Sequence, residues 1–139
     1  MNLLAQKLHL EIISPRRVFL DEEVDTAVVR TVSGDVGLMT DHIPMVAPLA
    51  IGRIKIVRDG KVREASCSEG VVNIRGNHAL VITEAIEWIE EIDIERARKA
   101  RERAEQRLQA KADEIDIDRA KAALMKALNR IEQYEQHKK

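Results

Sequence analysis

Apolar and polar residues alternate with a period of two through the first half of the chain. The clearest example is LHLEI at 8–12, in which Leu8, Leu10 and Ile12 are the apolar positions. Similar β-branched or alternating runs lie at 25–32, 53–58, 61–66, 70–74 and 78–83. Side chains two residues apart point to the same face of a strand, so this pattern predicts a series of short strands with one buried face.

Turn residues between these runs indicate how the strands are connected. Asp59-Gly60 separates two alternating runs, and Asp-Gly is a strong hairpin signal because a type I′ turn requires positive φ at both positions. Arg75-Gly76-Asn77 separates two more runs. Many short strands with turns at this spacing predict an antiparallel sandwich or barrel, which ends near Trp88.

The second part of the chain predicts uninterrupted helix. All six glycines and all three prolines lie at or before Gly76. The hexapeptide IDIERA at 92–97 recurs as IDIDRA at 115–120, and aspartate is a common helix N-cap, so Asp93, Asp116 and Asp118 predict the start of two helices. These helices are expected at 94–111 and 117–134.

The apolar positions of the two helices predict an antiparallel hairpin. On the second helix they are spaced alternately by three and four: Ile117, Ala120, Leu124, Ala127, Ile131 and Tyr134. The first helix offers mostly small residues: Ala97, Ala100, Ala104, Leu108 and Ala112. Small side chains allow close approach but bury little area, so the pair is expected to be marginally stable and able to open.

Charge and composition add a contrast between the two parts. The formal net charge is −1, but residues 92–139 carry 13 Lys and Arg against 10 Asp and Glu, a net +3. Cys67 is the single cysteine and is expected to be a small buried side chain without a disulfide. We find no apolar run of the roughly 20 residues that span a bilayer, so we expect a soluble intracellular protein without direct membrane insertion.

The residues suggest no catalytic activity. The four histidines are scattered without ligand spacing, so no metal site is expected, and no nucleophile motif or glycine-rich phosphate loop is present. Nucleic acid is a weak interpretation because stacking aromatics are few.

The stretch SGDVGLMTDHIPMVAPL at 33–49 has two equally weighted interpretations. It can be a loop that requires positive φ at Gly34 and Gly37, with Pro44 and Pro48 ending the pairing. It can also be a docking surface with exposed apolar residues, namely Leu38, Met39, Ile43 and Met45.

Basic residues of the predicted hairpin form a candidate anion site. In an antiparallel pair, Arg103 lies opposite residues 126–127, close to Lys126 and Arg130, with Arg96 two turns away. Clustered cations of this kind can bind a polyphosphate, although a solvated charged surface is the commoner explanation.

Taken together, the whole chain resembles the epsilon subunit of bacterial F-type ATP synthase. The resemblance rests on GDVGLxxxHxP at 34–44 and on an alanine-rich hairpin that opens with IDxxRA at 92–97. It implies a β-sandwich of about ten antiparallel strands at 1–88 and a regulatory two-helix hairpin at 89–139.

The resemblance implies a non-catalytic rotor subunit, peripheral on the cytoplasmic face of the cell membrane. The sandwich would bind the gamma subunit and the ring of c subunits. Its loop near the ring would use Gly34, Gly37, Leu38, Met39, His42 and Pro44. The extended hairpin would reach the alpha and beta subunits and inhibit ATP hydrolysis, with Arg98, Arg101 and Arg107 as the expected donors.

It also implies that the folded hairpin binds ATP as a regulatory ligand, with no required cofactor. The implied residues are Glu87, Ile92, Asp93, Arg96, Ala97, Arg103, Lys126 and Arg130. Lys126 stands where the strongest ATP binders of the family have arginine, and it offers a point charge in place of a two-pronged donor. The alternative is a free-standing nucleotide-sensing module without a rotary complex.

Overall fold

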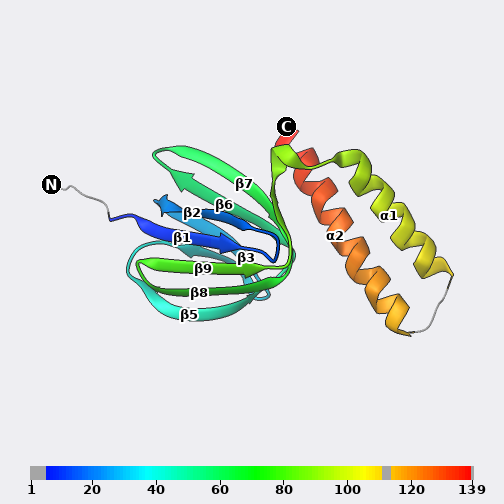
Figure 1. Ribbon diagram of the computed structural model, residues 1–139, viewed down its shortest axis with the longest axis horizontal. Helices are drawn as coiled ribbons and strands as arrows, with labels where there is room; N and C mark the ends of the chain where they lie inside the picture. The colour runs from blue at the N-terminus through cyan, green and yellow to red at the C-terminus, as the bar shows by residue number, and fades with distance from the viewer. Residues whose placement is uncertain (1–5, 111–113, 139) are drawn as a thin grey trace. The chain divides into compact units, whose positions relative to one another are not determined.

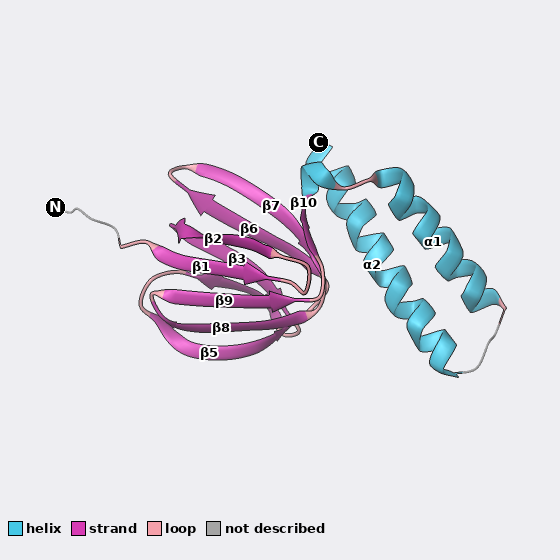
Figure 2. Ribbon diagram, in the orientation of Figure 1, coloured by secondary structure: helices cyan, strands magenta, loops and turns pink. Residues whose placement is uncertain are grey.

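The computed structural model describes residues 6–110 and 114–138. The chain divides into two compact units, Met1–Trp88 and Ile89–Lys139. The described strands belong to the first unit and the described helices to the second (Figures 1 and 2). The predicted fold class, a β-sandwich followed by an antiparallel helical hairpin, is confirmed.

Ten strands form the first unit. They are β1 (Leu8–Ile13), β2 (Val18–Val24), β3 (Thr26–Thr31), β4 (Gly34–Leu38), β5 (His42–Leu49), β6 (Gly52–Arg58), β7 (Lys61–Cys67), β8 (Gly70–Gly76), β9 (His78–Thr83) and β10 (Ile86–Trp88). Their spatial order is β10-β7-β6-β3-β5-β8-β9-β1-β2, and β4 pairs with β3. Among the described ladders only β1 with β9 is parallel, which departs from the all-antiparallel expectation.

The core of this unit is built from the alternating apolar residues. On β1, Leu8, Leu10 and Ile12 are fully buried, while the residues between them are half-buried. Fully burying an aliphatic side chain of this size stabilises a fold by about 1.5–3 kcal/mol. Cys67 is buried as predicted, and burial raises the pKa of its thiol to about 11.

A charged cluster also links β2 to β6 and β7. The Glu22 carboxylate accepts hydrogen bonds from Arg58 and Arg63. Burial alone would raise the pKa of Glu22, but the two guanidinium groups outweigh it and hold that pKa below its ordinary value. The ion pairs therefore join strands that no backbone ladder connects directly.

The turns agree only in part with the sequence. Asp59 and Gly60 both have positive φ, 50° and 77°, which confirms the predicted hairpin turn. Gly34 has φ 120° as predicted, but Gly37 has no positive φ and the left-handed residue is instead Asp41, at φ 60°. The reason is that Gly37 lies within β4, opposite Val28 of β3, so its backbone is extended.

The second unit contains a short 3₁₀ helix and two α-helices. These are η1 (Ile89–Glu91), α1 (Ile94–Gln109) and α2 (Glu114–Lys138), and α1 and α2 run side by side in opposite directions (Figure 1). Asp93 caps α1, since its Oδ1 accepts from the backbone N–H of Arg96 at 3.1 Å, which confirms the prediction. No helix in the described ranges is long and apolar enough to span a membrane.

The second copy of the repeated hexapeptide does not cap a helix. Because α2 already begins at Glu114, Asp116 and Asp118 lie inside its first two turns. Carboxylates in the first turn of a helix still interact favourably with the positive end of its dipole. The second copy is therefore part of the helix start, but it is not the cap that the sequence predicted.

Candidate functional site

Alanine forms the contact between α1 and α2. The apolar side chains that these helices fully bury in their described parts are Ala97, Ala104, Ala120 and Ala127. Leu124 and Ile131, two of the predicted apolar contact positions of the second helix, are half-buried. The row of apolar contacts between α1 and α2, which we call the seam, therefore buries little side-chain area, as the sequence predicted.

An ion pair shows which residues of α1 and α2 lie opposite each other along the helix axes. Arg98 Nη2 is 3.2 Å from Glu135 Oε1. An antiparallel pair advances equally along both helices, so five residues further Arg103 lies level with the turn that carries Lys126 and Arg130. Arg103 and Arg130 thus lie at one level of the hairpin, and Lys126 lies one turn, about 6 Å, further along α2.

These cations differ in their surroundings. Arg103 is exposed, whereas Lys126 and Arg130 are half-buried and already interact with other groups. Arg96 is exposed in the first turn of α1. Long side chains of this kind can converge on an anion while their stems remain packed.

The remaining residues implied for the ATP site have structural roles that the sequence did not separate. Ile92 is buried between η1 and the start of α1, and Ala97 is buried in the contact between α1 and α2. Neither residue presents a polar side chain. Asp93 uses its carboxylate as the α1 cap. Glu87 belongs to the other unit, on β10, where it pairs with Ser66 of β7.

The arginines expected to inhibit hydrolysis are partly engaged in the folded hairpin. Arg98 pairs with Glu95 and Glu135, and Arg101 Nε is 3.6 Å from Glu105 Oε1. Arg107 is exposed and has no ion pair to the residues that the structure describes. Exposed ion pairs contribute only about 0–1 kcal/mol, so these arginines are readily released.

The predicted docking loop is partly wrong. Leu38 is fully buried in the core, opposite Ala27 of β3, because it ends β4 on the inward-facing side of that strand. Met39 and Ile43 are 54% and 79% exposed, so they remain candidates for a contact. His42 and Pro44 lie within β5, and His42 Nδ1 is 2.7 Å from the carbonyl oxygen of Ile43.

Pro48 does not end the pairing, contrary to the prediction, whereas Pro44 lies at a register shift between His42 and Met45 that interrupts the β5–β8 ladder without ending it. Both lie within β5, and Pro48 is opposite Val71 of β8. On its other side, β5 pairs with β3 through Leu49 opposite Thr31, and the Val32 N–H donates to the Pro48 carbonyl oxygen at 3.2 Å. The missing proline N–H groups therefore disturb little.

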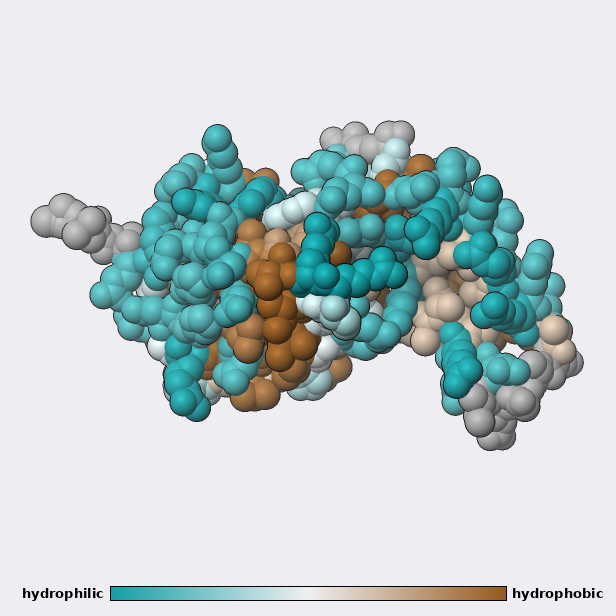
Figure 3. Space-filling model, in the orientation of Figure 1, coloured by the Kyte–Doolittle hydropathy of each residue, from teal (hydrophilic) through white to brown (hydrophobic). Residues whose placement is uncertain are grey.

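A second apolar surface was missed in the sequence. It lies on the outward-facing side of β1, β5, β8 and β9, and we call it the apolar face: Ile13, Val46, Pro48, Val71, Leu80 and Ile82. Val46 and Ile82 are 68% and 43% exposed, and Figure 3 shows a hydrophobic patch on the strand unit. The sequence did carry a signal for it, namely the consecutive apolar residues at 12–13, 71–72 and 80–82. A strand with one solvent-exposed face would alternate apolar and polar residues at these positions.

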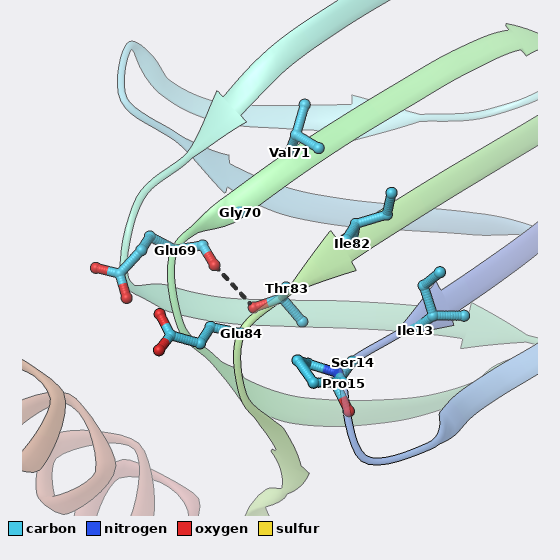
Figure 4. A pocket seen from close by; sticks show the side chains of 9 residues that line it. All are labelled: Ile13, Ser14, Pro15, Glu69, Gly70, Val71, Ile82, Thr83 and Glu84. Atoms are coloured by element: carbon cyan, nitrogen blue, oxygen red, sulfur yellow. Dashed lines mark hydrogen bonds between the residues drawn. The ribbon is translucent and has the colours of Figure 1, made fainter.

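An open pocket of about 560 Å³ adjoins the apolar face. It is lined by residues at the ends of β1, β8 and β9: Ile13, Ser14, Pro15, Glu69, Gly70, Val71, Ile82, Thr83 and Glu84 (Figure 4). A Cβ at Gly70 would lie 2.0 Å from the carbonyl oxygen of Ile82, so only glycine permits this approach of β8 to β9. Thr83 Oγ1 donates to the carbonyl oxygen of Glu69 at 3.1 Å and fixes the same edge.

Two stacked histidines lie on the same side of the sheet. The rings of His9 and His78 are 5.1 Å apart, and His78 Nε2 is 3.5 Å from Glu11 Oε1. Hydrogen bonds to Glu23 and then Asp21 raise the pKa of His9 above its ordinary value. No cluster of three or more metal-ligating side chains occurs among the described residues.

The raised pKa of His9 predicts a pH-dependent stability. A group whose pKa is higher in the folded state stabilises the fold fully below its unfolded pKa of about 6.5, and this contribution is lost as pH rises through the folded value. We expect the melting temperature of the wild type to fall relative to that of His9→Gln between about pH 6 and pH 8. A difference in melting temperature between the two proteins that does not change with pH would contradict the prediction.

Comparison with known proteins places this geometry in a family. The family described as ATP synthase, Delta/Epsilon chain, beta-sandwich domain matches residues 7–89. The one described as ATP synthase, Delta/Epsilon chain, long alpha-helix domain matches residues 90–133. The chain belongs to the ATP synthase delta/epsilon family. The predicted family is thereby confirmed.

Curated relatives support this family membership over more than nine-tenths of the chain. An ATP synthase epsilon chain of Alkaliphilus metalliredigens is 52% identical over 128 residues, which cover 92% of this chain and 96% of the relative. One of Caldicellulosiruptor bescii is 42% identical over 132 residues, which cover 95% and 96%.

Chains in two solved ATP synthase structures share the fold. A chain in the mitochondrial ATP synthase of Euglena gracilis, solved as OSCP/F1/c-ring, superposes with a TM-score of 0.79 at 26% identity, over 98% of this chain and 83% of that chain. A chain in the central stalk/c-ring of the Tetrahymena thermophila mitochondrial enzyme has a TM-score of 0.61 at 14% identity, which supports the fold alone.

Proposed function

We propose that the chain is a non-catalytic central-stalk subunit of bacterial F-type ATP synthase. Its sandwich binds the gamma subunit and the c ring, and its hairpin regulates ATP hydrolysis. It acts as a peripheral subunit on the cytoplasmic side of the membrane. Family membership and the likeness to a chain of an F1/c-ring complex support this assignment.

The observation that carries the proposal is the unequal packing of the two units. The sandwich has a core of large aliphatic side chains, among them Leu8, Ile54 and Ile74, each at most 1% exposed. The paired helices fully bury only four alanines in their described parts, and four methyl groups contribute about 3 kcal/mol. A stable docking unit is thus joined to a pair of helices that small free-energy changes can separate.

The apolar face is the proposed gamma-binding surface. It presents aliphatic side chains from four strands on a rigid sheet, and rigid apolar patches rimmed by polar groups are typical of protein interfaces. Its polar rim includes His9, His78 and Glu11. Met39, just after β4, and Ile43, near the start of β5, remain the proposed contact with the c ring.

Charged substitutions on the apolar face test this docking. Val46→Asp with Ile82→Asp places two carboxylates in an apolar contact, and we expect gamma binding to fall by at least about 100-fold, because each buried unpaired charge costs several kcal/mol. Val62→Asp is the matched control, since Val62 is 51% exposed on β7, away from this face. Titration of gamma with each folded variant measures the effect, and equal losses in both variants would contradict the assignment.

The hairpin is the proposed regulatory element. In the folded state Arg103, Lys126 and Arg130 lie within one helical turn of each other and bind the phosphates of ATP, with Asp93 and Arg96 near the nucleoside. In the extended state these groups separate, so ATP binds the folded state better and shifts the population toward it. The extended hairpin, with its net charge of +3 over residues 92–139, contacts the alpha and beta subunits and inhibits hydrolysis.

A further inference from the structure

Gln133 of α2 has a buried acceptor without a partner. The residue is 5% exposed, and its Nε2 donates to Asn129 Oδ1 at 3.1 Å. Its Oε1 has no hydrogen-bond partner within the described residues. Buried polar atoms are almost always hydrogen-bonded in native proteins, so this oxygen is a candidate for satisfaction by a ligand.

Gln133 lies on the same face of α2 as the proposed phosphate-binding cations. Lys126, Arg130 and Gln133 are spaced by four and then three residues, which places them in one row along a helix. At 1.5 Å per residue, Gln133 lies about 10 Å along the axis from Lys126. A nucleotide laid along this row with its terminal phosphate at Lys126 extends its base toward Gln133.

The direction of the row agrees with the rest of the hairpin. Glu135, two residues beyond Gln133, pairs with Arg98 in the second turn of α1. Gln133 therefore belongs to the end of the hairpin where Asp93 starts α1, which is the end proposed for the nucleoside. Along α2, the cations proposed for the phosphates thus come first, and the unpartnered oxygen follows at the end proposed for the base.

We propose that Gln133 Oε1 accepts a hydrogen bond from the exocyclic amino group of adenine in bound ATP. This inference rests on the proposed ATP site of the folded hairpin. Adenine presents an amino donor at the position where guanine presents a carbonyl acceptor. An acceptor already fixed by Asn129 therefore selects ATP over GTP, because guanine would place two acceptors face to face.

Gln133→Leu tests the proposal in the full-length chain. Leucine is similar in size and removes the acceptor, so ATP affinity and the ATP-to-GTP affinity ratio should each fall about tenfold. Affinity for inorganic tripolyphosphate should stay unchanged because the cations are intact. The same variant should raise the melting temperature of the ligand-free hairpin, since it removes a buried unpartnered oxygen.

Gln136→Leu is the matched control. Gln136 is exposed three residues later and donates to Glu132, so its replacement should leave the affinity ratio unchanged. An unaltered ATP-to-GTP ratio in Gln133→Leu would overturn the base-reading role while the ATP site stands. If the wild type binds neither ATP nor tripolyphosphate, both the site and its base reader are wrong.

Discussion

Arg103→Ala is expected to remove most ATP binding by the full-length chain. Arg103 is an exposed guanidinium level with Arg130 and one turn from Lys126, and its side chain can orient toward a polyphosphate. Hydrogen bonds to charged groups contribute about 1.5–3 kcal/mol, so the loss should be roughly 10- to 100-fold in affinity. Isothermal titration with ATP measures it directly.

Two further variants show whether the effect belongs to the cluster. Lys126→Arg should hold or tighten ATP binding, because a planar two-pronged donor replaces a point charge. Lys121→Ala removes the same charge as Arg103→Ala from an exposed position of α2 and should leave the affinity unchanged. Equal ATP affinity in wild type and Arg103→Ala would mean that the cations form only a solvated surface.

The expected size of the ligand effect matches the weakness of the seam. A ligand that binds only one state shifts the equilibrium by RT ln(1 + [L]/Kd), which is about 2.7 kcal/mol at a hundredfold excess over Kd. The four buried alanines contribute about 3 kcal/mol. ATP can therefore hold or release a helix pair of this kind, whereas a leucine-rich seam would not respond to so small a term.

Most strands and the start of α1 were predictable because each depends on local sequence. Alternation over a few residues fixes which face of β1 is buried, and Asp59-Gly60 defines the turn between β6 and β7 by backbone sterics alone. Asp93 caps α1 through a hydrogen bond to a residue only three positions away. Such features require no knowledge of distant neighbours.

The errors arose where pairing outweighs local preference. Gly37 and Leu38 were assigned to a loop from the abundance of glycine and proline, yet β3 pairs with that segment and turns Leu38 into the core. The parallel ladder of β1 with β9 joins segments some 70 residues apart in the chain, so no local sequence pattern could predict it.

Site residues defined by burial were the least predictable. Gln133 resembles any polar residue of a charged helix, and only its burial and unpartnered oxygen distinguish it. The apolar face left a signal in consecutive apolar residues, but strand register was needed to bring Val46, Val71 and Ile82 onto one surface.

Removing residues 90–139 is expected to raise ATP hydrolysis by the assembled complex several-fold while proton pumping persists. The truncation leaves the ten strands and their core intact, so the remaining unit should fold and dock alone. Hydrolysis and pumping are measured in membranes depleted of the subunit and supplied with either chain. Unchanged hydrolysis would exclude an inhibitory hairpin, and lost pumping would place part of the docking surface in the helices.

A triple variant, Arg98→Ala with Arg101→Ala and Arg107→Ala, distinguishes two roles for these arginines in the same hydrolysis assay. If these arginines bind the catalytic subunits in the extended state, the triple variant should raise hydrolysis as truncation does. If they act only in the folded state, losing the Arg98–Glu135 pair between the two helices would loosen the hairpin. More of it would then extend, and hydrolysis would fall below the wild-type rate. The sign of the change therefore distinguishes contact with the catalytic subunits from stabilisation of the folded hairpin.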